Sequence, residues 1–513
     1  LDPVNNFSDG TWSNIRAAAG VCYLNLESDY TGDTIRNITF NFSGTPIQGS
    51  NFNVRRNSAS PDIVFSNVYG NLGTYQFEDD EEATPSATTG KLRWPGITQT
   101  NWTGAVNTDW HNPGNWDNGV PTAMLDAIVP SRPNQAHIMN GDAVCKNLII
   151  TTGTVILENN NNLTTTGDIT IGTAANVGIL AVSTPASTIY CGGMWTRGTN
   201  GVFVHGGGTV VFNSSAGSVT ITPLTSSFNN VTFNNVNTTF YLSGATINIL
   251  GDFQILAGTV TPVTNNYTYN IGGNINFQGT FTPTAGAVVN GTVVLNGSSD
   301  QQITNGVFYN LTVGGSGNKI TSGATTINGA TVINSTLKAT AGSSIDFNGD
   351  VTINAGGTFD DGNQTHYFTG VNWTGTGNYV GGGTVIFDRT ASDVNLWSGT
   401  FNHLILQCTG RYVYHRGNIT VNGNFTINGL PGTMGFSSSA LITSSGTGTM
   451  TMDAGAYYYC NGANNFPATF ALYNIDAASR VYYQNNIDQT VAGVSYGNLY
   501  LSNKTKTLAG DIV

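Results

Sequence analysis

The residues best suited to ligand chemistry in this sequence are arginines and tyrosines that alternate in two short stretches. The first runs from Arg411 to Arg416, and the second is the triplet at 457–459. Tyrosine rings exposed on neighbouring strands stack on sugars, and arginine donates to hydroxyls or carboxylates. The candidate glycan-binding residues are Arg411, Tyr412, Tyr414, Arg416, Tyr457 and Tyr459. The alternative is that one residue of each alternating pair belongs to the core and the other packs in an ordinary stack between strands.

Cleavage of a polysaccharide needs clustered carboxylates with a cationic partner, or a paired general acid and base. Residues 151–300 contain only five charged side chains. Two of them, Asp168 and Asp252, follow glycine in a repeated turn that carries asparagine at Asn274 and Asn424. A carboxylate is therefore not required in that turn, and we expect the protein not to be an enzyme.

The alternative function is a polysaccharide-active β-helix enzyme, either a lyase or a hydrolase, or a lectin. The nearest carboxylate groupings for catalysis are Asp346 with Asp350 and Asp360 with Asp361. The six histidines show no metal-binding spacing. The acidic run at 78–82 lacks the ligand spacing of a dedicated calcium loop, so calcium has no support. We expect no cofactor and no metal ion.

Charged side chains are scarce, which restricts the partners of this chain. They make up 9% of the residues, against about 25% in typical soluble domains. A net charge of −12 with 17 lysines and arginines argues against nucleic acid and anionic membrane surfaces. The sequence contains no run of about 18 apolar residues, which is the length needed to span a bilayer. The five cysteines are far apart, which excludes a zinc cluster and favours small buried apolar residues.

Alternation of apolar and polar residues at period two predicts an all-β protein. It occurs at 209–212, 247–249, 352–354 and 426–428, with glycine, asparagine and aspartate between such runs. One phrase, an aromatic residue two positions before asparagine and a strand, begins at Phe228, Phe308 and Tyr496, and a variant with histidine in place of that asparagine begins at Phe401. The steps between these four aromatic residues are 80, 93 and 95 residues. A period of this size would also fit tandem immunoglobulin-like sandwiches.

A parallel β-helix, or β-solenoid, fits the repeats better than tandem sandwiches do. No charged or proline-rich linker separates the large repeats, and strand phrases return every 20 to 30 residues inside them. That spacing is typical of one solenoid coil, which stacks only on its neighbours. Asparagines at matching corners of successive coils would form hydrogen-bonded ladders.

The predicted domains follow changes in composition. Residues 1–90 form a small β-rich domain of unknown role, and 91–135 form a tryptophan-rich linker and solenoid cap. Residues 136–513 form the solenoid, which we expect to be truncated within a longer chain because 510–513 falls inside a repeat phrase.

Three tryptophans lie within 15 residues of the predicted cap. The first coil of a solenoid has an apolar cross-section and open strand edges, which large rings would cover. The predicted cap residues are Trp102, Asp109, Trp110, Asn115 and Trp116. The alternative is that the rings form an exposed platform for stacking on sugars.

The order Trp-x-Gly, Asp-Trp, Asn-Trp and Val-Pro in this segment resembles the opening of β-helical modules in very large surface adhesins of the Bacteroidetes. These include gliding-motility adhesins exported by the type IX secretion system, and the phrase at 496–501 followed by 506–512 resembles their repeats. The resemblance covers roughly residues 100–513. It implies an extracellular location on the bacterial cell surface, a role in cell adhesion, and contact with secretion and surface-anchoring machinery.

We therefore expect a secreted, non-enzymatic segment of a cell-surface adhesin. The solenoid would act as a stiff stalk with weak glycan contacts. Its ligand would be a surface polysaccharide or another extracellular molecule.

Overall fold

The computed structural model describes residues 98–283, 291–429 and 440–512, and outside these ranges the backbone of strands β1 to β6 and β49. Strands account for the secondary structure of the described residues, apart from one 3-10 turn, η1 (Pro113–Asn115). The strands pair in parallel and form a β-solenoid of about 17 turns. The predicted all-β class and parallel β-helix are confirmed, and tandem antiparallel sandwiches are excluded for the described residues.

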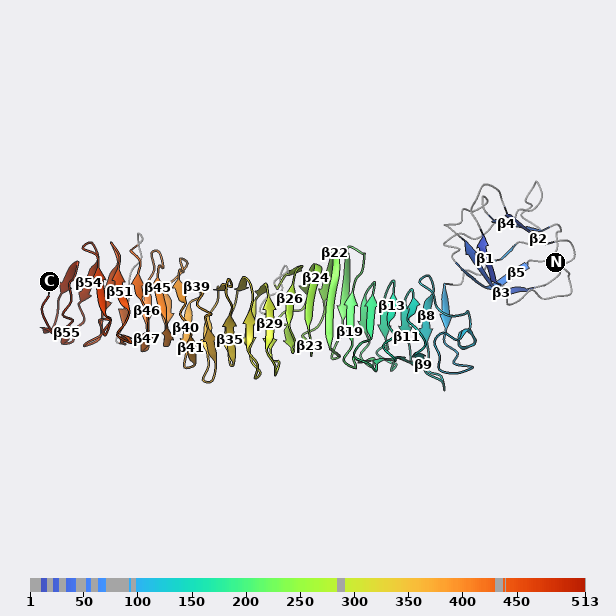
Figure 1. Ribbon diagram of the computed structural model, residues 1–513, viewed down its shortest axis with the longest axis horizontal. Helices are drawn as coiled ribbons and strands as arrows, with labels where there is room; N and C mark the ends of the chain where they lie inside the picture. The colour runs from blue at the N-terminus through green and yellow to red at the C-terminus, as the bar shows by residue number, and fades with distance from the viewer. Residues whose placement is uncertain are drawn as a thin grey trace. The chain divides into compact units, whose positions relative to one another are not determined.

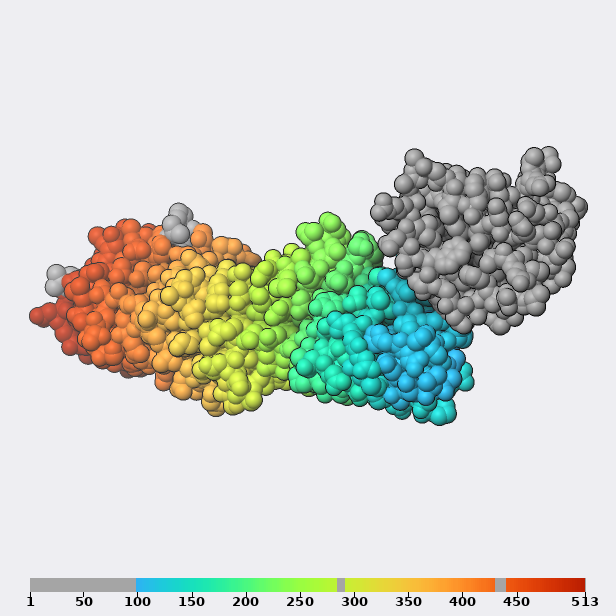
Figure 2. All heavy atoms as spheres, turned by 45° about the vertical axis from the view of Figure 1, so that its right-hand side comes forward, coloured from blue at the N-terminus to red at the C-terminus, as the bar shows by residue number. Residues whose placement is uncertain are grey.

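The chain divides into two compact units, Leu1–Gly192 with Arg197–Phe203 and Gly193–Thr196 with Val204–Val513. In the second unit the strands follow one another in chain order from β19 (Thr209–Phe212) to β54 (Arg480–Tyr483), as Figure 1 shows. Figure 2 shows the same order as successive bands of colour on the surface of this unit. Each coil therefore packs on the coils that precede and follow it in the sequence, as solenoid coils do.

A coil consists of three short strands joined by turns. One coil of the first unit contains β11 (Leu148–Ile150), β12 (Thr154–Leu157) and β13 (Leu163–Thr165), and the next contains β14 (Ile169–Ile171), β15 (Ile179–Val182) and β16 (Thr188–Cys191). Leu148 lies opposite Ile169, an offset of 21 residues, whereas Thr292 in the second unit lies opposite Asn310, an offset of 18. Turns of different length therefore leave the strand register intact.

Parallel pairing also occurs among the first ninety-three residues. The backbone strands there are β1 (Thr11–Ile15), β2 (Cys22–Leu26), β3 (Thr34–Phe42), β4 (Phe52–Arg56), β5 (Ile63–Gly70) and β6 (Leu92–Arg93). β1, β3, β5 and β6 form one sheet, and β2 pairs with β4. Thr11 lies opposite Thr39 and Thr34 opposite Val64, offsets of 28 and 30 residues. This part is β-rich, as predicted, while the acidic run at 78–82 lies outside the described residues.

The core is a set of inward-facing columns of apolar side chains. In β11, Leu148 and Ile150 are fully buried while Ile149 between them is partly exposed. Burial of such a side chain contributes about 1.5–3 kcal/mol. Cys145, Cys191, Cys408 and Cys460 belong to this core and form no disulfide, which confirms the prediction for these four. Burial raises the pKa of Cys408 to about 12, so its thiol stays protonated and unreactive.

A side-chain hydrogen bond links successive coils at the repeated Asn and Gly-Asp phrases. Asn147 Oδ1 accepts the backbone N–H of Asp168 at 2.7 Å. In the second unit Asn230 Oδ1 accepts the N–H of Asp252 at 2.9 Å, and Asp252 Oδ1 accepts the N–H of Asn274 at 2.7 Å. The predicted corner ladder is therefore present. Asparagine and aspartate can replace one another as the acceptor of this bond because both carry an Oδ1 atom.

The glycine before the ladder residue is explained by the same contact. A Cβ added to Gly167 would lie 2.2 Å from Asn147 Oδ1, and one added to Gly251 would lie 2.2 Å from Asn230 Oδ1. Neither distance is compatible with a side chain at that position unless the asparagine moves. Glycine therefore precedes the ladder residue because the asparagine of the preceding coil occupies the space that a Cβ atom would need.

Polar side chains enter the solenoid at two places where a glutamine on one coil lies opposite a lysine on the next. The buried Gln301 donates from Nε2 to the carbonyls of Ile271 and Gly273, and Lys319, also buried, donates from Nζ to those of Gly297 and Gly317. Burial lowers the pKa of Lys319, against the opposing effect of Asp300. Gln489 and Lys506 repeat the arrangement, with Nε2 and Nζ each donating to two backbone carbonyls. The buried Gln301, Lys319 and Gln489 thereby use their own donor groups inside the solenoid instead of burying them unpaired.

We predict that Gly251→Ala destabilises the protein by about 1–3 kcal/mol, the usual cost of overpacking. In an Asn230→Ala background the added Cβ meets no Oδ1 atom, so the same substitution should cost much less. Gly217→Ala is the matched control, because nothing lies within 4 Å of its added Cβ. Denaturant unfolding of the four combinations measures the coupling, and equal costs in both backgrounds would contradict the contact.

Candidate functional site

The tryptophan segment forms a coil that pairs with the strands after it. β7 (Gln99–Asn101) pairs in parallel with β8 (Asp126–Val129). Asp109 forms a parallel bridge to His137 in β9 (Ala136–Ile138), and the His137 carbonyl accepts the N–H of Trp110 at 2.9 Å. The backbone of the segment is therefore tied into the solenoid at two places.

The three tryptophan rings are packed against one another inside this coil. Trp102 and Trp110 are 0% exposed and Trp116 is 4% exposed. Trp116 makes edge-to-face contacts with Trp102 at 5.1 Å and with Trp110 at 4.7 Å between ring centroids. Since no ring face is open to solvent, these residues cannot serve as a platform for sugars in this conformation. Their packing is consistent with the capping role, which stays a prediction.

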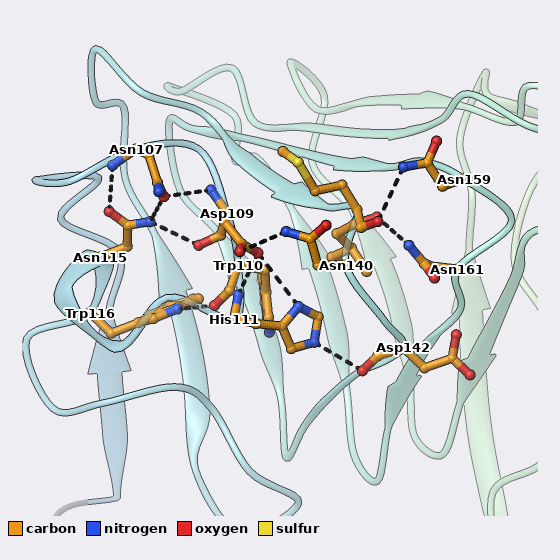
Figure 3. A network of polar contacts seen from close by, with 12 residues as sticks. Asn107, Asp109, Trp110, His111, Asn115, Trp116, Asn140, Asp142, Asn159 and Asn161 are labelled. Atoms are coloured by element: carbon orange, nitrogen blue, oxygen red, sulfur yellow. Dashed lines mark hydrogen bonds and ion pairs between the residues drawn. The ribbon is translucent and has the colours of Figure 1, made fainter.

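The polar cap residues hold the turns around the rings, as Figure 3 shows. The buried Asn115 donates from Nδ2 to Asn107 Oδ1 and to the Asp109 carbonyl, while its Oδ1 accepts the N–H groups of Val106 and Asn107. All four hydrogen-bonding positions of this amide are thereby used.

Asp109 joins the segment to the following coil. Its carboxylate accepts the His111 N–H at 3.0 Å and Asn140 Nδ2 at 2.8 Å. Partial burial acts to raise the pKa of Asp109, but the hydrogen bonds from Asn140 and His111 and the nearby imidazole outweigh it and lower the pKa. The carboxylate therefore stays ionised and acts as a turn acceptor.

The glycan-binding candidates come together on the outside of the second unit. Tyr412 directly precedes β46 (Val413–His415), and Tyr414 lies at the centre of this strand, between the buried Val413 and His415. Tyr457 and Tyr459 belong to β52 (Tyr457–Cys460) and are partly exposed on either side of buried Tyr458. The two pairs meet, since the Tyr412 and Tyr459 ring centroids are 6.2 Å apart.

The row continues over two coils that the sequence analysis did not include. Tyr482 of β54 stacks on Tyr459 at 4.6 Å, and Tyr500 of β56 (Asn498–Leu501) stacks on Tyr482 at 4.5 Å. Tyr412, Tyr414, Tyr459, Tyr482 and Tyr500 are hereafter called the tyrosine row. Aligning the strands 457–460, 480–483 and 498–501 would have found it, because Tyr459, Tyr482 and Tyr500 share one register position.

Arginines lie against the tyrosines. The Arg416 guanidinium lies 4.6 Å from the centroid of the Tyr414 ring. Arg480, also absent from the sequence prediction, lies 5.2 Å from the Tyr457 centroid and donates to its hydroxyl at 2.7 Å. Arg411 donates from Nε to the Thr390 carbonyl at 2.9 Å. The row thus combines ring edges, phenol hydroxyls and outward cations, which are groups that bind sugars.

The carboxylates of the alternative enzyme hypothesis make structural contacts. Asp361 is buried and accepts from the Tyr379 hydroxyl at 2.6 Å and from the Gly383 N–H at 2.8 Å. Asp360 pairs with Lys338 at 3.1 Å, and Asp350 accepts the N–H of Asn372 at 2.9 Å. Burial raises the pKa of Asp346. Within the described ranges, no three histidine, cysteine or acidic side chains gather where they could hold a metal ion.

No family model, curated protein or solved structure matches this chain. Among the residues that the structure describes, no helix has the length and apolarity needed to cross a membrane.

We predict that Trp110→Ala costs about 3–5 kcal/mol of local stability, as loss of a buried tryptophan ring does. Hydrogen exchange should show faster exchange of the amides at 126–150, which pack against or follow the tryptophan segment. Trp397→Ala, at an exposed site, is the control and should leave this exchange unchanged. Full protection of 126–150 in the Trp110 variant would contradict the capping role.

Proposed function

We propose that this chain is a non-enzymatic structural and adhesive segment of a secreted bacterial cell-surface adhesin. Its stacked coils serve as a stiff stalk, and its tyrosine row makes weak contacts with an extracellular polysaccharide. The observation that carries the proposal is the tyrosine row itself, five outward rings of one solenoid, of which Tyr459, Tyr482 and Tyr500 lie on successive paired strands.

The chemistry of the row favours binding over turnover. The tyrosines supply ring edges and hydroxyls and the arginines supply donors, but none of these groups exchanges a proton readily near neutral pH. Burial and the neighbouring tyrosines raise the pKa of Tyr459 to about 12, so its phenol remains neutral. A site of this kind holds a sugar without activating it.

Repetition compensates for weak individual contacts. A polysaccharide that touches several positions of the row gains affinity from effective concentration, without any single deep pocket. The proposal includes secretion, surface anchoring and an association with gliding-motility adhesins. These parts are supported by the resemblance of the tryptophan segment to such adhesins. A low-charge, asparagine- and threonine-rich surface suits an extracellular stalk that displays neutral polar groups.

We predict binding without release of products on pectin, alginate, xylan and host glycans. Co-sedimentation should detect retention of the protein, and assays for reducing ends and unsaturated uronides should stay at background. Replacing Tyr459 and Tyr482 together by alanine should lower retention several-fold, while Tyr367→Ala, an exposed tyrosine outside the row, should not. Product release that is abolished by Asp346→Asn or Asp360→Asn would overturn the proposal in favour of an enzyme.

A further inference from the structure

Trp397 differs from the other tryptophans of the described residues in being open to solvent. It is 47% exposed, whereas Trp102, Trp110, Trp116, Trp195 and Trp373 are between 0% and 4% exposed. Within the described ranges, it also has no aromatic ring packed on it, whereas Tyr482 stacks on both Tyr459 and Tyr500. An exposed indole with no aromatic ring stacked on it offers a sugar ring a larger apolar surface than a tyrosine stacked between two others.

Trp397 lies next to an arginine on the following coil. It comes directly after β43 (Val394–Leu396), which pairs with β46 so that Asn395 lies opposite Tyr414 and Leu396 opposite His415. The next position in that register puts Trp397 opposite Arg416. The Arg416 N–H donates to the Leu396 carbonyl at 2.8 Å, which extends the ladder to this point. Neighbouring parallel strands are about 4.8 Å apart, so one sugar could touch both side chains.

The Arg416 side chain is held in place but not neutralised. Its Nε donates to Asn395 Oδ1 at 3.1 Å, and its guanidinium lies against the Tyr414 ring. Asn395 is itself fixed by donating from Nδ2 to Asn372 Oδ1 at 3.1 Å. Among the described residues, no carboxylate forms an ion pair with Arg416, and its two terminal nitrogens have no acceptor. A planar guanidinium with free terminal donors matches a carboxylate.

We propose that Trp397 and Arg416 form a subsite for one carboxylated sugar of an acidic polysaccharide. The sugar ring stacks on the free indole face, and its carboxylate accepts hydrogen bonds from the Arg416 terminal nitrogens. Asn395 and Tyr414 are positioning residues that orient the guanidinium. This inference rests on the proposed glycan-binding function and names the class of sugar that the surface selects.

The test uses the full chain titrated with polygalacturonate, alginate and polysialic acid, and with methyl-esterified pectin and xylan as uncharged probes. Binding of an acidic probe should change the tryptophan emission, because Trp397 is the exposed indole among the described residues. Either Trp397→Ala or Arg416→Gln should weaken acidic binding by about tenfold or more, as loss of a charged hydrogen bond does. Trp397→Phe should keep most of the affinity, and Arg416→Lys should retain the part due to charge.

Lys146→Gln is the control, since it removes an exposed cation that lies outside the tyrosine row and its arginines, and it should leave acidic binding unchanged. All variants should melt like the unmodified protein, because both side chains are exposed. Glycan binding that survives Trp397→Ala and Arg416→Gln would overturn the subsite and leave the proposed function standing. Equal affinity for acidic and uncharged probes would overturn the carboxylate preference, and no binding to any probe would overturn both proposals.

Discussion

Hydrogen bonds between one coil and the next hold this solenoid together, and the most specific of them comes from a side chain. At the repeated corner, Oδ1 of an asparagine or aspartate accepts the N–H of the matching residue one coil later, as in Asn230, Asp252 and Asn274. Backbone pairing alone would permit a slip by one residue, which would turn every core side chain outward. The corner bond and the glycine beside it allow one register only, so the inward columns stay apolar.

A fixed register also decides what the outside of the solenoid presents. Because each strand alternates, Tyr458 enters the core while Tyr457 and Tyr459 face outward. Repeating that alternation coil after coil places Tyr482 and Tyr500 above Tyr459 without any additional loop or domain. An adhesive surface on such a scaffold is therefore a column of equivalent positions, which suits a long repetitive ligand better than a small molecule.

The sequence predicted the architecture because the solenoid uses local, repeated signals: alternation at period two, and turn residues every 20 to 30 positions. It named Tyr412, Tyr414, Tyr457 and Tyr459 as candidates, which the structure brings together, but it did not include Tyr482 and Trp397. The neighbours of these two residues come from coils about 20 residues away and depend on exact register. The burial of Lys319 could not be predicted either, because a single lysine is expected on the surface unless its position in the coil is known.

The most direct test of the account is a distance between spin labels at Val307 and Asn474, two outward and exposed positions of the second unit. They lie 167 residues apart in sequence but share one column of paired strands, eight coils apart. Double electron–electron resonance should give one narrow distribution centred near about 38 Å, from about 4.8 Å per coil. A broad distribution, or one displaced by more than about 10 Å, would contradict parallel stacking in this register.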